Sequence, residues 1–402
     1  MSARLEFPAG FLWGAATSAH QVEGSNVNND WWYEEHARPG VIAEPSGDAC
    51  DSYHRWADDL DLVADVGLNA YRFSLEWSRI EPEPGELSQA ALDHYARMIE
   101  GCLQRGLTPV LTLHHFTLPR WFSRDGGWRR RDAVDRFARF CEAVVPLCRR
   151  VEWVCTINEP NIAAIMARPD AARKMGRGHG LPEPVPEIVD ALVAAHRRAR
   201  EIVGSLGGVK VGWTVANQAV EADPGCEELA GRYRYSREDQ FLDVARGDDF
   251  VGVQSYSRAV VGPDGPYIPD SPRSRTQTGW EYFPAALRTA VEHTSEITAG
   301  TPILVTENGI ATDDDKERIG YTRDALRGLH QAIAGGIDVR GYLHWSLLDN
   351  FEWFAGYRPT FGLAAVDRTT FERHPRPSAT WLRSIARSNT LDEAVATPQS
   401  LG

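Results

Sequence analysis

The chain has 402 residues, of which 43% are hydrophobic and 25% charged, as in an ordinary globular protein. Its formal net charge is −13, with acidic and basic residues interspersed, which argues against a nucleic-acid partner. No apolar run approaches the length that spans a membrane, so we expect no membrane partner.

Eight short segments rich in β-branched and aromatic residues alternate with longer amphipathic segments along the chain. The predicted strands cover, in chain order, residues 11–17, 69–77, 107–115, 151–159, 209–217, 250–257, 302–309 and 339–349. Three of the helical segments between them, at 51–67, 88–106 and 321–336, end in Gly as a C-terminal cap would.

Strict alternation of β and α units implies a parallel sheet, and eight units predict closure into one barrel. We therefore predict the α/β class, with a single (β/α)8 TIM barrel over residues 1–389 and a frayed C-terminal tail at residues 390–402. An open doubly wound sheet is the alternative, but it requires a Gly-rich phosphate turn near the first strand. The nearest candidate, the GRGHG run at 176–180, has the wrong spacing and follows no suitable strand.

Polar residues gather where the predicted strands end, which is where α/β barrels place their active sites. The strand bodies before them are mostly apolar. These residues are Gln21 just past the first strand, Glu76, His115, Asn158, Glu159, Tyr256, Glu307, Asn308 and the segment from Trp345 onward.

The second strand has an unusual inner face, because Arg72, Ser74 and Glu76 share one side by alternation. A strand buried on both sides should be apolar on both. The pattern predicts a charged barrel mouth in which Arg72 stabilises a nearby carboxylate. A structural ion pair between Arg72 and Glu76 is the alternative.

Two carboxylates, Glu159 and Glu307, end the fourth and seventh strands and can converge across the mouth of a small barrel. Glycosidic cleavage needs such a pair, one to protonate the leaving oxygen and one to attack or to activate water. The carboxyls lie roughly 5–5.5 Å apart in retaining enzymes and about 6.5–9.5 Å apart in inverting ones. Residue spacing alone leaves both distances open.

Rival chemistries have little support. The sequence contains no HExxH motif, no G-x-S-x-G elbow and no P-loop. His114 and His115 are adjacent in a strand, so they point to opposite faces and cannot chelate one metal. The acidic run Asp313–Asp315 could imitate a cation site, although a solvated loop is the stronger interpretation. We predict no metal site.

With these residues in view, the chain resembles the family-one glycoside hydrolases, the β-glucosidase/β-galactosidase family. The resemblance runs from FLWGAATSAHQVEG at Phe11 to RPSATWL near Trp381. Its most specific motifs are that N-terminal segment, TINEP around Glu159 and ILVTENG ending in Gly309. It implies a (β/α)8 barrel that hydrolyses β-linked sugars with retention and without a cofactor.

The resemblance also implies a role for each site residue. Glu159 would be the acid/base and Glu307 the nucleophile, with Asn158 on the sugar 2-hydroxyl. Arg72 and Tyr256 would contact the nucleophile. The remaining substrate-binding residues would be Gln21, His115, Glu352 and Trp353 on the outer hydroxyls, Trp345 as the floor under the sugar, and Phe361.

These roles carry electrostatic expectations. A cation and a hydroxyl donor should depress the pKa of Glu307, because a nucleophile must be ionised. The negative charge of Glu307 should raise the pKa of Glu159, because the acid must begin protonated.

Glu352 limits the class of sugar that the resemblance implies as substrate. A carboxylate there would repel a 6-phosphate, so free sugars are expected: β-glucosides first, then galactosides or fucosides. Transglycosylation through the same intermediate is one alternative, and a non-catalytic sugar-binding barrel is another. A small-molecule β-glycoside is the expected partner, and the sequence leaves the oligomeric state open.

Several departures from the family pattern affect the leaving-group side. Gln254 and Ser255 replace the usual residues before Tyr256, and Phe116 replaces a common Trp. The position just before Phe361 lacks a common basic residue. The chain is also short after Asn161 and between residues 217 and 250. We expect a more open or reshaped aglycone site, suited to bulky aglycones.

A cytoplasmic location is the last expectation. The first residues lack the charged and apolar regions of a secretory signal. None of the six cysteines belongs to a C-x-x-C pair, and most have apolar neighbours, as buried thiols in a reducing compartment do.

Overall fold

The computed structural model describes residues 4–37, 40–171, 180–270 and 275–392. Within these ranges, eight parallel strands form a closed ring in chain order, because the last pairs with the first and β6 pairs with β7. The predicted (β/α)8 barrel and all eight predicted strands are confirmed. The barrel strands are β2 (Leu12–Ala16), β3 (Ala70–Ser74), β4 (Thr108–His114), β5 (Trp153–Asn158), β6 (Lys210–Ala222), β7 (Val251–Gly262), β9 (Ile303–Asn308) and β10 (Val339–Trp345).

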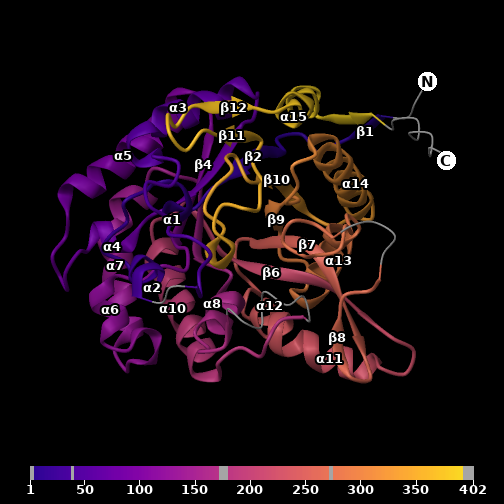
Figure 1. The fold of residues 1–402 in the computed structure, drawn as a ribbon, viewed down its shortest axis with the longest axis horizontal. Coiled ribbons are helices and arrows are strands. Elements are labelled where there is room, and N and C mark those ends of the chain that lie inside the picture. The colour runs from indigo at the N-terminus through magenta and orange to yellow at the C-terminus, as the bar shows by residue number, and fades with distance from the viewer. Residues whose placement is uncertain (1–3, 38–39, 172–179, 271–274, 393–402) are drawn as a thin grey trace.

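Helices surround the ring of strands (Figure 1). The three helical segments predicted to end in Gly are confirmed as α3, α5 and α14, and Gly67, Gly106 and Gly336 all adopt the positive φ of a C-terminal cap. The helices are α1 (Ala19–Val22), α2 (Asp30–Ala37), α3 (Ser52–Asp65), α4 (Trp77–Ile80), α5 (Gln89–Gln104), α6 (Arg120–Arg124), α7 (Ala133–Cys148), α8 (Pro160–Met166), α10 (Pro186–Gly204), α11 (Glu227–Arg234), α12 (Gln240–Val244), α13 (Ala286–Ile297), α14 (Asp315–Ala334) and α15 (Pro377–Ser388). Short helical turns lie at η1 (Gly127–Arg129), η2 (Tyr235–Asp239) and η3 (Trp353–Ala355).

The barrel interior is filled by side chains near the starts of several strands. A compact apolar cluster includes Ala70, Val110, Trp153, Phe250 and Leu304, all buried. Trp153 and Phe250 meet edge to face, with ring centroids 5.1 Å apart. This plug leaves the opposite, C-terminal end of the barrel as the place for a site, as in other α/β barrels.

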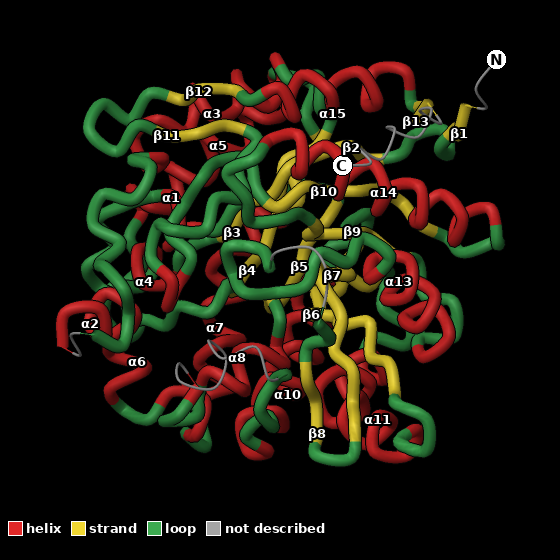
Figure 2. Tube along the Cα trace, turned by 45° about the vertical axis from the view of Figure 1, so that its right-hand side comes forward, coloured by secondary structure: helices red, strands yellow, loops and turns green. Residues whose placement is uncertain are grey.

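Strands β6 and β7 run several residues past their predicted ends and form a ribbon outside the barrel (Figure 2). Strand β8 (Gly265–Tyr267) returns antiparallel along β7 and lengthens the ribbon. Helix α11 covers it through Tyr233, which clusters with Ala259 and Val261. The ribbon persists because its apolar side chains are buried under this helix.

The two ends of the described chain pair with each other. Strand β1 (Arg4–Glu6) is antiparallel to β13 (Thr390–Asp392), and Leu391 is buried between them and the core. The prediction of a frayed tail is therefore wrong for residues 390–392, because a buried Leu anchors them; residues 393–402 lie outside the described ranges. A second small sheet joins β11 (Ala364–Val366) to β12 (Arg373–Pro375).

All six cysteines are buried and free, as predicted. Among the described residues, no helix is both long and apolar enough to cross a membrane. Most of the GRGHG run, residues 176–179, lies outside the described ranges.

Candidate active site

A cavity of about 470 Å³ opens at the C-terminal ends of the barrel strands. Arg72 and Asn158 lie directly behind its wall and bond to the residues that line it. The structure thus gathers every predicted site residue. Those that line the cavity are Gln21, His115, Glu159, Tyr256, Glu307, Trp345, Glu352, Trp353 and Phe361.

Glu307, near the end of β9, is held by donors from two other strands. Arg72 of β3 donates to its Oε1 at 2.6 Å, and the hydroxyl of Tyr256 on β7 donates to its Oε2 at 2.7 Å. Arg72 is fully buried, and its Nε donates to Thr112. These contacts fix the direction of the carboxylate and favour its charged form.

Glu159 lies at the turn from β5 into α8. Its backbone is left-handed, with φ of 42°, and its N–H donates to the carbonyl of Thr214 at 2.8 Å. The side chain does not cap the helix that begins at Pro160. A carboxyl released from capping is free to face the cavity and exchange a proton there.

The two carboxyls differ in their electrostatic environment. Burial, and then the negative charge of Glu307, raise the pKa of Glu159 well above its ordinary value. Burial also raises the pKa of Glu307, while Arg72 and the Tyr256 hydroxyl pull it back down. The expected depression for Glu307 is thus wrong in net direction, because burial outweighs both partners. Glu159 still has the higher pKa of the two, so the proton of the pair lies on Glu159.

Asn158 presents its amide nitrogen to the cavity side. Its Oδ1 accepts from Arg72 Nη2 at 2.5 Å and from Thr214 Oγ1 at 3.1 Å. Its Nδ2 lies 3.2 Å from Nε2 of His115. Burial, and then the charge of Arg72, lower the pKa of His115 well below its ordinary value, so the imidazole is neutral.

Glu352 faces the cavity from the loop after β10. Trp345 Nε1 donates to its Oε1 at 3.2 Å. Burial raises the pKa of Glu352 to about 8, with Trp345 opposing and Glu307 adding to the rise. Gln21 lies in the same corner and donates to Asn350 and to the carbonyl of Phe351.

Aromatic rings form the walls around these polar groups. Trp353 is parallel to His115, with centroids 6.2 Å apart, and edge-on to Phe116 at 5.1 Å. Phe361 packs edge-on against Tyr256 at 5.9 Å. A sugar bound here would lie among apolar rings with hydroxyl partners at their edges.

Arg72 and Glu76 do not form the alternative ion pair. Glu76 instead accepts hydrogen bonds from Asn26, Ser78 and Thr117, which join loops at the edge of the barrel mouth. Its role is structural, because it caps α4 and organises these loops.

Gln254 is a site residue that the sequence analysis recorded only as a departure. Its Nε2 donates to Glu307 Oε1 at 2.8 Å and to Asn158 Oδ1 at 2.9 Å. The signal was present, since Gln254 and Tyr256 share one face of β7 by alternation. Trp280, on the loop before α13, was missed entirely; it lines the cavity and contacts Tyr256 at 5.5 Å.

The outer part of the cavity is largely apolar. It is lined by Phe116, Ile162, Met166, Leu181, Ile268, Trp280 and Pro359. The charged Arg258 of this wall is neutralised by Glu281 at 2.8 Å and Glu221 at 2.8 Å.

Two residues of the acidic run Asp313–Asp315 make structural contacts at the start of α14. Asp314 caps α14 by accepting from the N–H of Lys316, and Asp315 pairs with Arg318 at 2.6 Å. No group of three or more metal-binding side chains occurs in the described part of the chain.

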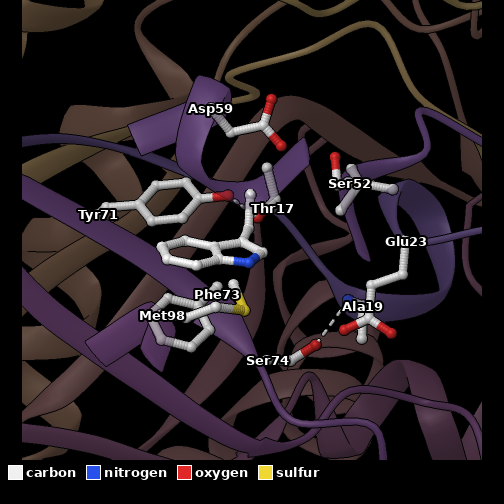
Figure 3. A pocket seen from close by; sticks show the side chains of 11 residues that line it. Thr17, Ala19, Glu23, Ser52, Asp59, Tyr71, Phe73, Ser74 and Met98 are labelled. Atoms are coloured by element: carbon white, nitrogen blue, oxygen red, sulfur yellow. Dashed lines mark hydrogen bonds between the residues drawn. The ribbon is translucent and has the colours of Figure 1, made fainter. Parts of the chain in front are cut away.

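A second, much smaller hollow lies between β3 and the helices α3 and α5 (Figure 3). Asp59, Tyr71 and Met98 line it, and its volume of about 10 Å³ is that of one water molecule. It is a packing defect lined by both polar and apolar side chains, and it has no room for an organic ligand.

Comparison with known proteins gives a consistent result. The family model described as glycosyl hydrolase family 1 matches residues 3–201 and 246–391. The thermostable beta-glucosidase B of Thermobispora bispora is 36% identical over 96% of this chain and 92% of its own length. A bifunctional beta-D-glucosidase/beta-D-fucosidase of Bifidobacterium breve is 32% identical over 94% of this chain and 97% of its own.

Solved structures agree. A β-glycosidase from Pyrococcus horikoshii superposes with a TM-score of 0.89 at 35% identity, covering 97% of each chain. The β-glycosidase BGL167 gives a TM-score of 0.88 at 43% identity, over 97% of this chain and 99% of that one. Sequence, fold and the paired carboxyls at the barrel mouth therefore lead to one assignment: the chain belongs to glycosyl hydrolase family 1.

Proposed function

We propose that this protein is a retaining β-glucosidase that removes terminal, non-phosphorylated β-linked glucose through a covalent glycosyl-enzyme. The observation that carries the proposal is the asymmetry of the two carboxyls. Glu307 is bound by a guanidinium and a phenol, whereas the pKa of Glu159 is raised well above the ordinary value. Glycosidic cleavage requires one ionised and one protonated carboxyl, and retention by double displacement is the mechanism of glycosyl hydrolase family 1, to which the chain belongs.

In the first step, Glu307 attacks the anomeric carbon as the bond to the leaving oxygen breaks. Glu159 gives its proton to that oxygen. Asn158 donates to the 2-hydroxyl, an interaction that strengthens as the transition state forms. Arg72 and Tyr256 keep the nucleophile aimed at the anomeric carbon.

In the second step, water replaces the aglycone. Forming the ester removes the negative charge of Glu307, which lowers the pKa of Glu159 toward its ordinary range. Glu159 can then take a proton from the water that attacks the anomeric carbon, and Glu307 is released.

Glu352 supports the choice of free sugars. Its carboxyl shares a cavity with Glu307 and Trp345. A 6-phosphate near it would bring a dianion into a poorly solvated space and would oppose any ionisation of Glu352, whose pKa burial already raises to about 8. We assign Gln21, His115, Glu352 and Trp353 to the outer hydroxyls of glucose, with Trp345 and Phe361 as apolar surfaces.

The proposal is tested by Glu307→Gly, assayed on an activated aryl β-glucoside with and without azide. Activity should fall by several orders of magnitude and return with azide, giving an α-glucosyl azide. The matched control is Glu372→Gly on the exposed loop before β12, which should behave as the parent enzyme. Full activity of Glu307→Gly without azide would refute the assignment.

We further propose that the aglycone is bulky and apolar. The outer cavity wall offers aromatic and aliphatic side chains, and its half-buried Arg258 is paired with Glu221 and Glu281. Arg358 of the same wall is exposed to solvent. Turnover should be better with bulky aryl or terpenoid glucosides than with short cellooligosaccharides. A strong preference for cellobiose would overturn this substrate class while leaving the β-glucosidase assignment intact.

A cytoplasmic location is also proposed. Six free, buried thiols suit a reducing compartment, where cysteines remain unpaired. Fractionation of the producing cells tests the point, and recovery of the enzyme from the medium would contradict it.

A further inference from the structure

Gln254 lines the cavity and joins the carboxylate of Glu307 to the amide of Asn158. Its side chain is 1% exposed and projects from β7, where it is paired in register with Glu307 of β9. A bulge between Val253 and Gln254 shifts the ladder at this point. The bulge re-aims the side chain toward its neighbours in the barrel mouth.

A single nitrogen of Gln254 joins two groups of the site. Nε2 donates to Glu307 Oε1 at 2.8 Å and to Asn158 Oδ1 at 2.9 Å. A primary amide has two N–H donors, so both are used. Gln254 thereby holds the nucleophile and the neighbouring amide at a fixed separation.

The hydrogen bond from Gln254 makes the two carboxylate oxygens of Glu307 different from each other. Oε1 accepts from both Arg72 and Gln254, which fills its two lone pairs. Oε2 accepts from Tyr256 and retains one lone pair. The geometry favours Oε2 as the atom that attacks.

The same contact fixes the orientation of Asn158. Its Oδ1 accepts from three donors, namely Arg72, Thr214 and Gln254. Turning the Asn158 amide over would bring its NH₂ group against all three. The donor end of Asn158 must therefore face the sugar.

The orientation of Gln254 itself is also determined. Its Oε1 is buried and accepts no hydrogen bond from the described residues. Exchanging the two ends of the amide would set Oε1 against the oxygens of Glu307 and Asn158, all of them acceptors. The repulsion among three acceptors outweighs one unpaired carbonyl.

We propose that Gln254 is a positioning residue that couples the nucleophile to the donor for the sugar 2-hydroxyl. This inference rests on the proposed glucosidase function. In the first step, the Oε2 lone pair forms the bond to the anomeric carbon as the bond to the leaving oxygen breaks, and Glu159 supplies the proton to that oxygen. Gln254 holds Oε1 out of the reaction and keeps Asn158 on the 2-hydroxyl as charge develops.

The test is Gln254→Met, which keeps the length of the side chain and removes the donor. kcat/KM for an aryl β-glucoside should fall roughly 10- to 100-fold, the usual effect of one lost bond to a charged group. The fall should be clearly smaller for the aryl 2-deoxyglucoside, because that substrate makes no 2-hydroxyl contact. Equal falls for both substrates, or no fall, would overturn the proposal.

The acid limb of the kcat/KM profile provides a second readout. The charged and titratable groups facing Glu307 are Arg72 of β3, Glu159 after β5, Tyr256 of β7 and Glu352 after β10. Removing a donor from the carboxylate raises its pKa, so the acid limb should move to higher pH in Gln254→Met. An unmoved limb would mean that Gln254 serves packing alone.

Gln254→Glu is the second variant, and it keeps both size and shape. It places a carboxyl beside Glu307, so the acid limb should move further upward than in Gln254→Met. An acid limb that stays at the wild-type position would contradict the proposed contact between Gln254 and Glu307. Gln331→Met, on the exposed surface of α14, is the matched control and should leave both readouts unchanged.

Wild-type enzyme and Glu307→Gly with azide are run in parallel. If azide fails to rescue, the proposed function itself fails. If rescue succeeds while Gln254→Met affects both substrates equally, only the role of Gln254 fails.

Discussion

The proton shared by Glu159 and Glu307 resides on Glu159 because the two side chains have different partners. Three donors reach Glu307, from Arg72, Gln254 and Tyr256. No hydrogen bond to the carboxyl of Glu159 is found among the described residues, and the negative charge of Glu307 lies close by. Burial acts on both, so the difference between them comes from these contacts.

Glu159→Ala should separate the two halves of the mechanism. Activated aryl glucosides should keep much of their first-step rate, whereas alkyl glucosides should lose about 10²- to 10⁴-fold, the usual contribution of a general acid. The alkaline limb of kcat/KM should also vanish, because in the parent enzyme activity falls as pH rises through the raised pKa of Glu159. Stopped-flow and steady-state rates across pH measure both effects; a retained alkaline limb would assign the acid to another group.

The roles proposed for Glu159 and Glu307 as acid and nucleophile are predictions that rest on the resemblance of the TINEP and TENG segments to the family. Their pKa directions could be predicted only for Glu159. For Glu307 the result depends on how completely the barrel mouth excludes water, and no residue pattern encodes that quantity. Gln254 was overlooked for a similar reason, since its partners lie on β5 and β9 and are distant in sequence.

At the scale of elements, the ribbon of β6, β7 and β8 links the barrel to the aglycone wall. Tyr233 of α11 accepts from the N–H of Leu181 at 2.8 Å and donates to Gln218 at 2.8 Å. Leu181 and Gln218 both line the cavity. Burial raises the pKa of Tyr233 to about 12, so the phenol remains a neutral donor.

Tyr233→Phe should loosen this wall and spare the glucose site. KM for a bulky aryl glucoside should rise about 3- to 10-fold, as expected for the loss of one or two neutral hydrogen bonds. Inhibition by free glucose should be unchanged, since no glucose-site residue contacts Tyr233 in the described structure. Tyr235→Phe, at an exposed neighbouring position, is the control. Equal weakening of glucose and aryl glucoside would show that the two sites are not separable.

The ribbon was predicted only in part. Alternation in 209–217 and 250–257 marks the barrel portion, because those residues face either the interior or the helices. Beyond them the strands depend on α11 for burial, and that contact joins distant segments. Residues 202–245, which hold all of β6 and α11, also fall outside the matched segments of the family model.

At the scale of the whole molecule, the segment that follows the last helix is joined to the segment that leads into the first barrel strand. Asn389 adopts a left-handed conformation with φ of 53°. Its Oδ1 accepts from Trp13 Nε1 at 2.9 Å, and its Nδ2 donates to the carbonyl of Phe7 at 2.7 Å. The last helix is thereby tied to the segment that enters the first barrel strand.

Asn389→Ala should lower the free energy of unfolding by about 2–4 kcal/mol. The value combines two lost hydrogen bonds with the cost of a left-handed Ala. Asn389→Gly loses the same bonds but tolerates the backbone, so it should be about 1 kcal/mol more stable than the Ala variant. Chemical denaturation monitored by tryptophan fluorescence gives both values. Wild-type stability in the Ala variant would show that this junction does not contribute to the stability of the fold.

The sequestered thiols have a practical consequence. Because all six cysteines are buried, a maleimide added to the native enzyme should find almost nothing to react with. One cysteine introduced at an exposed position, such as Val41 beside the cavity, would then carry a fluorophore at a single known place. Binding of an aglycone could then be followed as a change in the fluorescence of this label.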